Sequence, residues 1–154
     1  MVALGRAARR PLARSSRGSS LVELSLVLPL LLVLLAGIVD YALLFRDYEI
    51  VSNAAREGAR MGVLPGFTNV DVQNRVTAYL TDSGLSGTPT TIVGPVAVAP
   101  GGGGATFPAV QVQVSYPHAF TLLGPMLRLL GTTTFASVTL RATSTMRSES
   151  VVGS

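Results

Sequence analysis

Gly18, Ser19 and Glu23 are the residues whose types and spacing could do chemistry, and they lie where a basic leader gives way to an apolar run. If the peptide bond between Gly18 and Ser19 were cut, the new α-ammonium group would lie four residues before Glu23. Residues four apart share one face of a helix, so the ammonium group and the carboxylate could pair. The chemistry expected here is a peptide cleavage that creates a positive partner for a glutamate.

Glu23 is expected to need such a partner, because a membrane-spanning helix in this region must include it. Between Glu23 and Asp40 lie 16 residues without a formal charge. At about 1.5 Å per residue they cover roughly 24 Å, short of the ~30 Å hydrocarbon core. A span over residues 19–40 therefore places Glu23 inside the bilayer or at its rim, where a carboxylate costs on the order of 2.5–3.5 kcal/mol. In a bundle of such helices, the ammonium group of one chain could neutralise the glutamate of its neighbour.

The distribution of charge sets the expected topology and argues against nucleic acid as a partner. The first 18 residues hold five arginines and no acid, whereas seven arginines face eight carboxylates from Ser19 onward, a net charge of −1. The high isoelectric point thus describes the leader alone. By the positive-inside rule, we expect a single-pass protein of the cytoplasmic membrane with its N-terminus in the cytoplasm and its C-terminal domain translocated. The chain has no cysteine, so it can form neither a disulfide nor a thiolate site.

The elements that would position these residues belong to an α+β fold of 154 residues, enough for one small domain beside a membrane helix. We expect one continuous helix from about Ser20 to Met61, spanning the membrane in its first half and packed on a small antiparallel sheet in its second half. The expected organisation is a leader at 1–18, a transmembrane part at 19–40, an extracytoplasmic helical part at 41–63, an α+β domain at 64–149 and a tail at 150–154.

Two features of the long helix leave alternatives open. Pro29 removes one backbone hydrogen bond and predicts a helix kink, with a tolerated membrane proline as the alternative. Ala54, Gly58 and Gly62 form a stripe of small residues that allows another backbone to approach closely. This stripe could pack against the chain's own sheet, the alternative that we favour, or against another subunit.

The rest of the chain predicts one or two short helices and about three strands. Turn residues at 64–66 end the long helix, and a second helix is expected over Asn69–Asp82, with Thr68 or Asn69 as N-cap. Alternating apolar residues predict strands at 90–99, 109–116 and 135–146. The glycine run at 101–104 is expected to be a hairpin tip. The apolar residues 120–130 are too few to span a membrane and are expected to form a short helix or loop, buried in the core or contacting a partner.

Signs of catalysis are few. His118 is the only histidine, and its neighbours in the sequence supply no second ligand or base. The chain has no nucleophile-elbow pattern, and no serine has a histidine–carboxylate partner nearby in the sequence. We therefore expect no enzymatic activity, no cofactor, no metal and no small-molecule substrate.

Several stretches together carry a more specific pattern. They are Arg-Gly-Ser-Ser-Leu-Val-Glu-Leu-Ser-Leu-Val-Leu-Pro from residue 17, Gly-Ile-Val-Asp at 37–40, Asn-Ala-Ala-Arg-Glu-Gly-Ala-Arg at 53–60 and Ala-Thr-Ser-Thr-Met-Arg-Ser-Glu at 142–149. A basic leader, a glycine before the scissile bond and a glutamate five residues into the mature chain resemble a type IV prepilin. With the other stretches, the chain resembles the TadE-like family of pilus-assembly proteins.

This resemblance implies a minor pseudopilin of a tight-adherence (Flp) pilus system, with prepilin peptidase, the membrane and other pseudopilins or pilins as its partners. By the same resemblance Gly18 precedes the cut, Ser19 becomes the mature N-terminus and Glu23 is the acidic residue of the motif. The family often has an aromatic residue directly after this glutamate, where the present chain has Leu24.

Other functions predict a different N-terminus. An ordinary signal peptide requires small residues at the last and third-last positions before its cut, but cleavage after Ala36 or Gly37 would place Leu34 or Leu35 at the third-last position. A signal-anchored extracytoplasmic binding domain that is not a pilin would keep the leader. A secreted enzyme is a third and weaker alternative. N-terminal sequencing distinguishes cleavage after Gly18 from an uncut chain.

Overall fold

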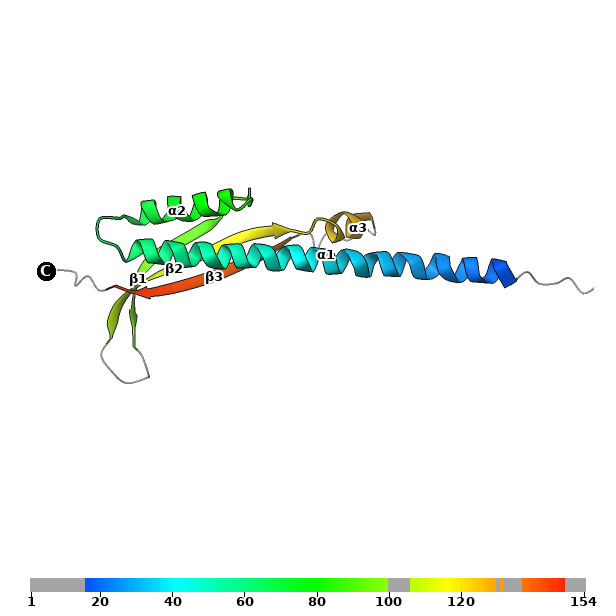
Figure 1. The fold of residues 1–154 in the computed structure, drawn as a ribbon, viewed down its shortest axis with the longest axis horizontal. Coiled ribbons are helices and arrows are strands. Elements are labelled where there is room, and N and C mark those ends of the chain that lie inside the picture. Colours follow the sequence, from blue (N-terminus) through cyan, green and yellow to red (C-terminus); the bar gives the residue numbers. More distant parts are fainter. Residues whose placement is uncertain (1–15, 100–105, 130, 132–136, 149–154) are drawn as a thin grey trace, which may run out of the picture. The chain divides into compact units, whose positions relative to one another are not determined.

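A computed structural model of the protein describes residues 16–99, 106–129, 131 and 137–148 (Figure 1). The leader before residue 16, the expected glycine tip at 101–104 and the tail at 150–154 lie outside the described residues. The chain divides between Leu35 and Ala36 into two compact units, which we describe separately.

Helix α1 (Ser16–Gly62) contains 47 residues and confirms the single long helix expected from about Ser20 to Met61. Its first part is rich in leucine, a strong helix former, and its second part has the apolar spacing of an amphipathic helix. The helix continues through Pro29, and the kink expected there remains a prediction. It ends before Pro65 and Gly66, where the positive φ of +90° at Gly66 turns the chain.

In the first compact unit, the described residues are those of α1 up to Leu35. Their large apolar side chains are exposed; Leu26 and Leu30, for example, are 73% and 70% exposed. Among the described residues, α1 is the one helix long and apolar enough to cross a membrane. Lipid is the environment in which so continuous an apolar surface is stable.

In the second unit, helix α2 (Asn69–Asp82) has the predicted bounds, with Thr68 as its N-cap, and begins at a capping box. The backbone N–H of Asp71 donates to the Thr68 hydroxyl at 3.3 Å, and the backbone N–H of Thr68 donates to the Asp71 carboxylate at 2.8 Å. The Thr68 hydroxyl also donates to the same carboxylate at 2.7 Å. The hydrogen bonds from the Thr68 side chain and then from its backbone hold the pKa of Asp71 below its usual value. Helix α2 thus has its own cap.

Three strands form an antiparallel sheet in the order β1-β2-β3 (Figure 1). They are β1 (Thr90–Val98), β2 (Phe107–Ala119) and β3 (Ser137–Arg147), and a short helix α3 (Leu123–Leu129) lies between β2 and β3 in the chain. Strand β2 extends three residues beyond the expected end at Tyr116. It can continue through Pro117 because β1 pairs with β2 only as far as Ser115, which leaves one edge of β2 open at the proline.

The core lies where the second half of α1 and helix α2 meet one face of the sheet. Its members are fully or almost fully buried: Val51, Ala54, Ala55 and Ala59 of α1, Val72, Val76 and Leu80 of α2, Leu85 of the loop after α2, Val112, Val114 and Tyr116 of β2, and Ala142 of β3. A Cβ atom added at Gly58 would lie 2.6 Å from Val76 Cγ2 and 3.2 Å from Val112 Cγ1. The small residues of α1 therefore pack against the chain's own helix and sheet, the alternative that we favoured.

We expect Gly58→Ala to have a free energy of unfolding lower by about 1–3 kcal/mol than a matched Gly→Ala control, because overpacking costs ~1–3 kcal/mol while the gain in helix propensity is the same in both variants. The matched control is Gly37→Ala in the same helix, where the nearest atom to the added Cβ is Leu123 Cδ1 at 4.0 Å. Thermal unfolding of the detergent-solubilised protein, followed by circular dichroism, measures both variants. A Gly58→Ala protein as stable as Gly37→Ala would contradict this packing.

Candidate functional site

The proposed processing residues lie at the start of α1. Gly18 and Ser19 are the third and fourth residues of the helix, so the bond between them is in its first turn. Gly18 is exposed, and apart from its chain neighbours and the adjacent helix backbone no described atom lies within 4 Å of the position that a Cβ would take there. Glu23 is exposed one turn further along the same helix. The continuous helix therefore places Ser19 and Glu23 on one face, the geometry on which the sequence hypothesis depends.

Asp40 has the most unusual environment among the described residues, because its carboxylate is completely buried. Its Oδ1 accepts hydrogen bonds from the backbone N–H groups of Thr121 and Leu122, each at 3.1 Å. Its Oδ2 accepts from the N–H groups of Leu122 at 3.1 Å and of Leu123 at 2.7 Å. Three consecutive amides thus replace the water that the carboxylate loses on burial.

The same contacts explain how helix α3 begins. Its first helical residue is Leu123, and its first turn contains no acidic residue. The preceding Leu122 has no side-chain acceptor with which to cap the helix. The first N–H groups of a helix need acceptors, and a negative charge is favourable at that end. Asp40 of α1 therefore caps α3 from a distant part of the chain.

Asp47 forms a second contact between α1 and the same part of the chain. Its Oδ2 lies 2.7 Å from Nδ1 of His118, and their side chains are 17% and 5% exposed. The His118 ring meets the Phe120 ring edge to face, with centroids 5.6 Å apart. Nε2 of His118 is buried without a hydrogen-bond partner among the described residues. Since Asp40 and Asp47 are seven residues apart, they lie on one face of α1 and attach residues 118–123 to it at two points.

Sequence reasoning did not assign either carboxylate this role. The pattern that could have indicated the burial of His118 is the alternation of buried residues in β2. Val112, Val114 and Tyr116 are buried, and the alternation continues to residue 118. An imidazole on that face needs a partner, but a partner 71 residues away cannot be identified from spacing. For Asp40, the pattern that could have indicated its role is the start of α3. This short helix follows Leu122, which cannot cap it, so it needs an acceptor from elsewhere in the chain.

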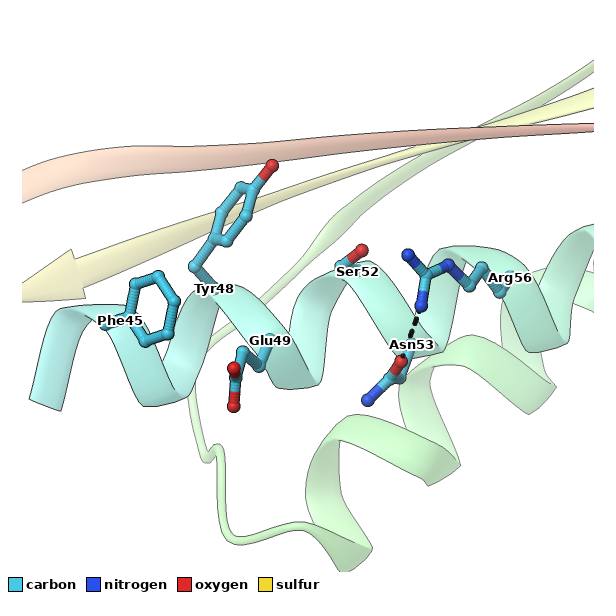
Figure 2. A pocket seen from close by; sticks show the side chains of 6 residues that line it. All are labelled: Phe45, Tyr48, Glu49, Ser52, Asn53 and Arg56. Carbon is cyan, nitrogen blue, oxygen red and sulfur yellow. Dashed lines mark hydrogen bonds between the residues drawn. The ribbon is translucent and has the colours of Figure 1, made fainter.

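A shallow hollow of about 420 Å³ lies on α1 beyond Asp40. Figure 2 shows the six side chains that line it, all from this helix, with Arg56 donating to Asn53 Oδ1 at 3.3 Å. Phe45 and Tyr48 are 52% and 43% exposed, and the lining also includes Glu49 and Ser52. Its lining holds one carboxylate, that of Glu49, and no imidazole. Within the part of the chain that the structure describes, no three acidic or histidine side chains lie close enough together to hold a metal ion.

The comparison with known families bears on the first part of this site. The model described as TadE-like protein matches residues 18–60, which begin at Gly18 and include Glu23, Asp40 and Asp47. This match confirms the TadE-like resemblance over that segment and indicates a protein related to tight-adherence pili. No curated protein and no solved structure matches the chain significantly.

We expect Asp40→Ala to destabilise the attachment of α3, because three amide donors lose a charged acceptor. Losing a hydrogen bond to a charged group costs about 1.5–3 kcal/mol. Hydrogen exchange of the detergent-solubilised protein should show faster exchange at residues 121–123, with the amides of α2 unaffected. The control is Glu49→Ala, which removes an exposed carboxylate from the same helix. Unchanged protection of residues 121–123 in Asp40→Ala would show that the amides do not depend on this carboxylate.

Proposed function

We propose that the protein is a minor pseudopilin that takes part in the assembly of a tight-adherence (Flp type IV) pilus. The observation that carries this proposal is the TadE-like match over residues 18–60, because it starts at the glycine that would precede the cut. An assembly role requires no catalytic group.

The proposal gives a chemical reason for cleavage after Gly18. Prepilin peptidase would remove a leader with five arginines and leave the α-ammonium group of Ser19 as the new terminus. The first turn of a helix lacks half of its backbone hydrogen bonds and opens readily, so a peptidase can reach this bond. The retained helix would then begin with an ammonium group followed one turn later by Glu23.

Glu23 would act in assembly through its charge. A carboxylate at this depth of the membrane costs free energy, and a nearby positive charge lowers that cost. In a bundle of processed chains, the Ser19 ammonium group of one chain would pair with Glu23 of its neighbour. The pair would form only at the correct relative height of the two helices, so it would select the register of the subunits during extraction from the membrane.

Cleavage is tested with Gly18→Leu, expressed in cells that carry a prepilin peptidase. We expect this variant to keep its leader, because a large side chain next to the scissile bond should block the peptidase. Intact mass and N-terminal sequencing of the membrane-extracted protein measure the outcome. The control is Val22→Leu, a conservative change at an exposed position of the same helix, which should be cut to begin at Ser19. Wild-type protein that still begins at residue 1 or 2 would refute the processing step and favour a signal-anchored binding domain.

Pairing is tested separately with Glu23→Gln, which keeps the shape of the side chain and removes its charge. We expect normal insertion and cleavage but about tenfold less incorporation into pilus fractions, since a charge-assisted hydrogen bond contributes about 1.5–3 kcal/mol and ~1.4 kcal/mol is a factor of ten. Glu49→Gln, on an exposed part of the same helix, should assemble normally. Pili of normal number and composition in the Glu23→Gln strain would contradict the pairing mechanism.

A further inference from the structure

The α3 segment, by which we mean residues 121–129, is attached to the end of the expected membrane span. The N–H groups of Thr121, Leu122 and Leu123 bind the Asp40 carboxylate. One turn earlier on α1, the Cβ position of Gly37 lies 4.0 Å from Leu123 Cδ1. Both points of α1 that the segment approaches therefore fall at residues 37–40.

The length of a membrane span fixes the depth of these two points. The hydrocarbon core needs about 20 helical residues. Counted from Ser20 the span ends near Val39, and counted from Leu24, the first residue after Glu23, it ends near residue 43. Gly37 lies within the hydrocarbon in both cases, and Asp40 lies at its boundary or inside it. The segment packed beside them must then be at the surface of the bilayer.

The composition of the segment suits that location. The Leu122 side chain is 41% exposed, and Pro125 is exposed, so the fold leaves apolar surface of this segment uncovered. Arg128 is exposed near the end of α3, where its long side chain can reach a lipid phosphate while its methylene groups stay in apolar surroundings. On α1, Tyr41 is 67% exposed, and tyrosine is enriched at the interface between membrane and water.

The hydrogen bonds of Asp40 remove the main objection to this placement. A bare carboxylate at the edge of the hydrocarbon would be costly. Here the Asp40 carboxylate is buried and accepts hydrogen bonds from three backbone N–H groups. These N–H groups in turn have the carboxylate as their acceptor. Neither the carboxylate nor the start of α3 then exposes an unpaired polar group to lipid.

We propose that the α3 segment is an interfacial membrane anchor that inserts its apolar side chains into the lipid headgroup region at the Asp40 end of the span. The lipid bilayer itself covers this exposed surface. The segment holds the second compact unit at the membrane through a contact additional to the helix that spans it. This inference requires a membrane-spanning α1 but neither cleavage at Gly18 nor a role in pili, so it can fail or hold independently of the proposed function.

The chain contains no tryptophan, so a single tryptophan reports its own environment. The full protein is reconstituted into vesicles of phosphatidylcholine and phosphatidylglycerol, with or without bromine on the acyl chains. We expect Leu122→Trp to be quenched several-fold more strongly by the brominated lipid than Val70→Trp, a control at a 60% exposed position of α2. The substitution at Leu122 keeps the backbone N–H that binds Asp40. Pro125→Trp provides a second exposed position on α3 and should give the same result.

Two outcomes would overturn the proposal. Both α3 tryptophans could be quenched by brominated lipid no more than Val70→Trp and respond instead to aqueous acrylamide. Leu122→Cys, in a chain that has no cysteine of its own, could form a disulfide-linked dimer in the vesicles, which would assign the surface to a second copy.

Discussion

The buried carboxylate of Asp40 is the constraint on which the arrangement of the second compact unit depends. A charge cannot be buried unless donors replace its water, and here the backbone N–H groups of three consecutive residues do so. Those donors are available only if the chain after β2 returns to α1 at this height. The position of one side chain thus specifies where residues 121–123 must lie, and the Asp47–His118 contact fixes the same segment two turns further along the helix.

Helix α1 is one continuous helix whose two parts have different surfaces. In the first compact unit its leucines are exposed, as a lipid-facing surface requires. In the second unit alanine and glycine replace them on the buried face, so that α2 and the sheet can approach closely at Gly58. The change occurs near Asp40, whose carboxylate binds the backbone N–H groups of residues 121–123. Large side chains make the surface for lipid, and small ones make the contact with protein.

Local patterns predicted most of the fold because local physics decides it. The bounds of α2 follow from Thr68 and Asp71 at one end and Gly84 at the other, all of which are visible in the sequence. The strands follow from alternation, although β2 continues past Tyr116 because its edge is open at Pro117. The processing residues that we propose at 18–23 were inferred from residue type and spacing alone. The contacts of Asp40 and Asp47 were missed because their partners are 71 to 83 residues away, and only the completed fold brings them together.

Glu23 and Asp40 flank the uncharged stretch of α1, and they differ in how their charge is compensated. For Asp40 the compensation comes from the chain's own amides and is present as soon as the chain folds. For Glu23 the compensation that we propose comes from another chain and exists only after cleavage has created an ammonium group. The Asp40 contact belongs to the folded chain itself, whereas the proposed Glu23 pair would pass from a waiting subunit to an assembling one.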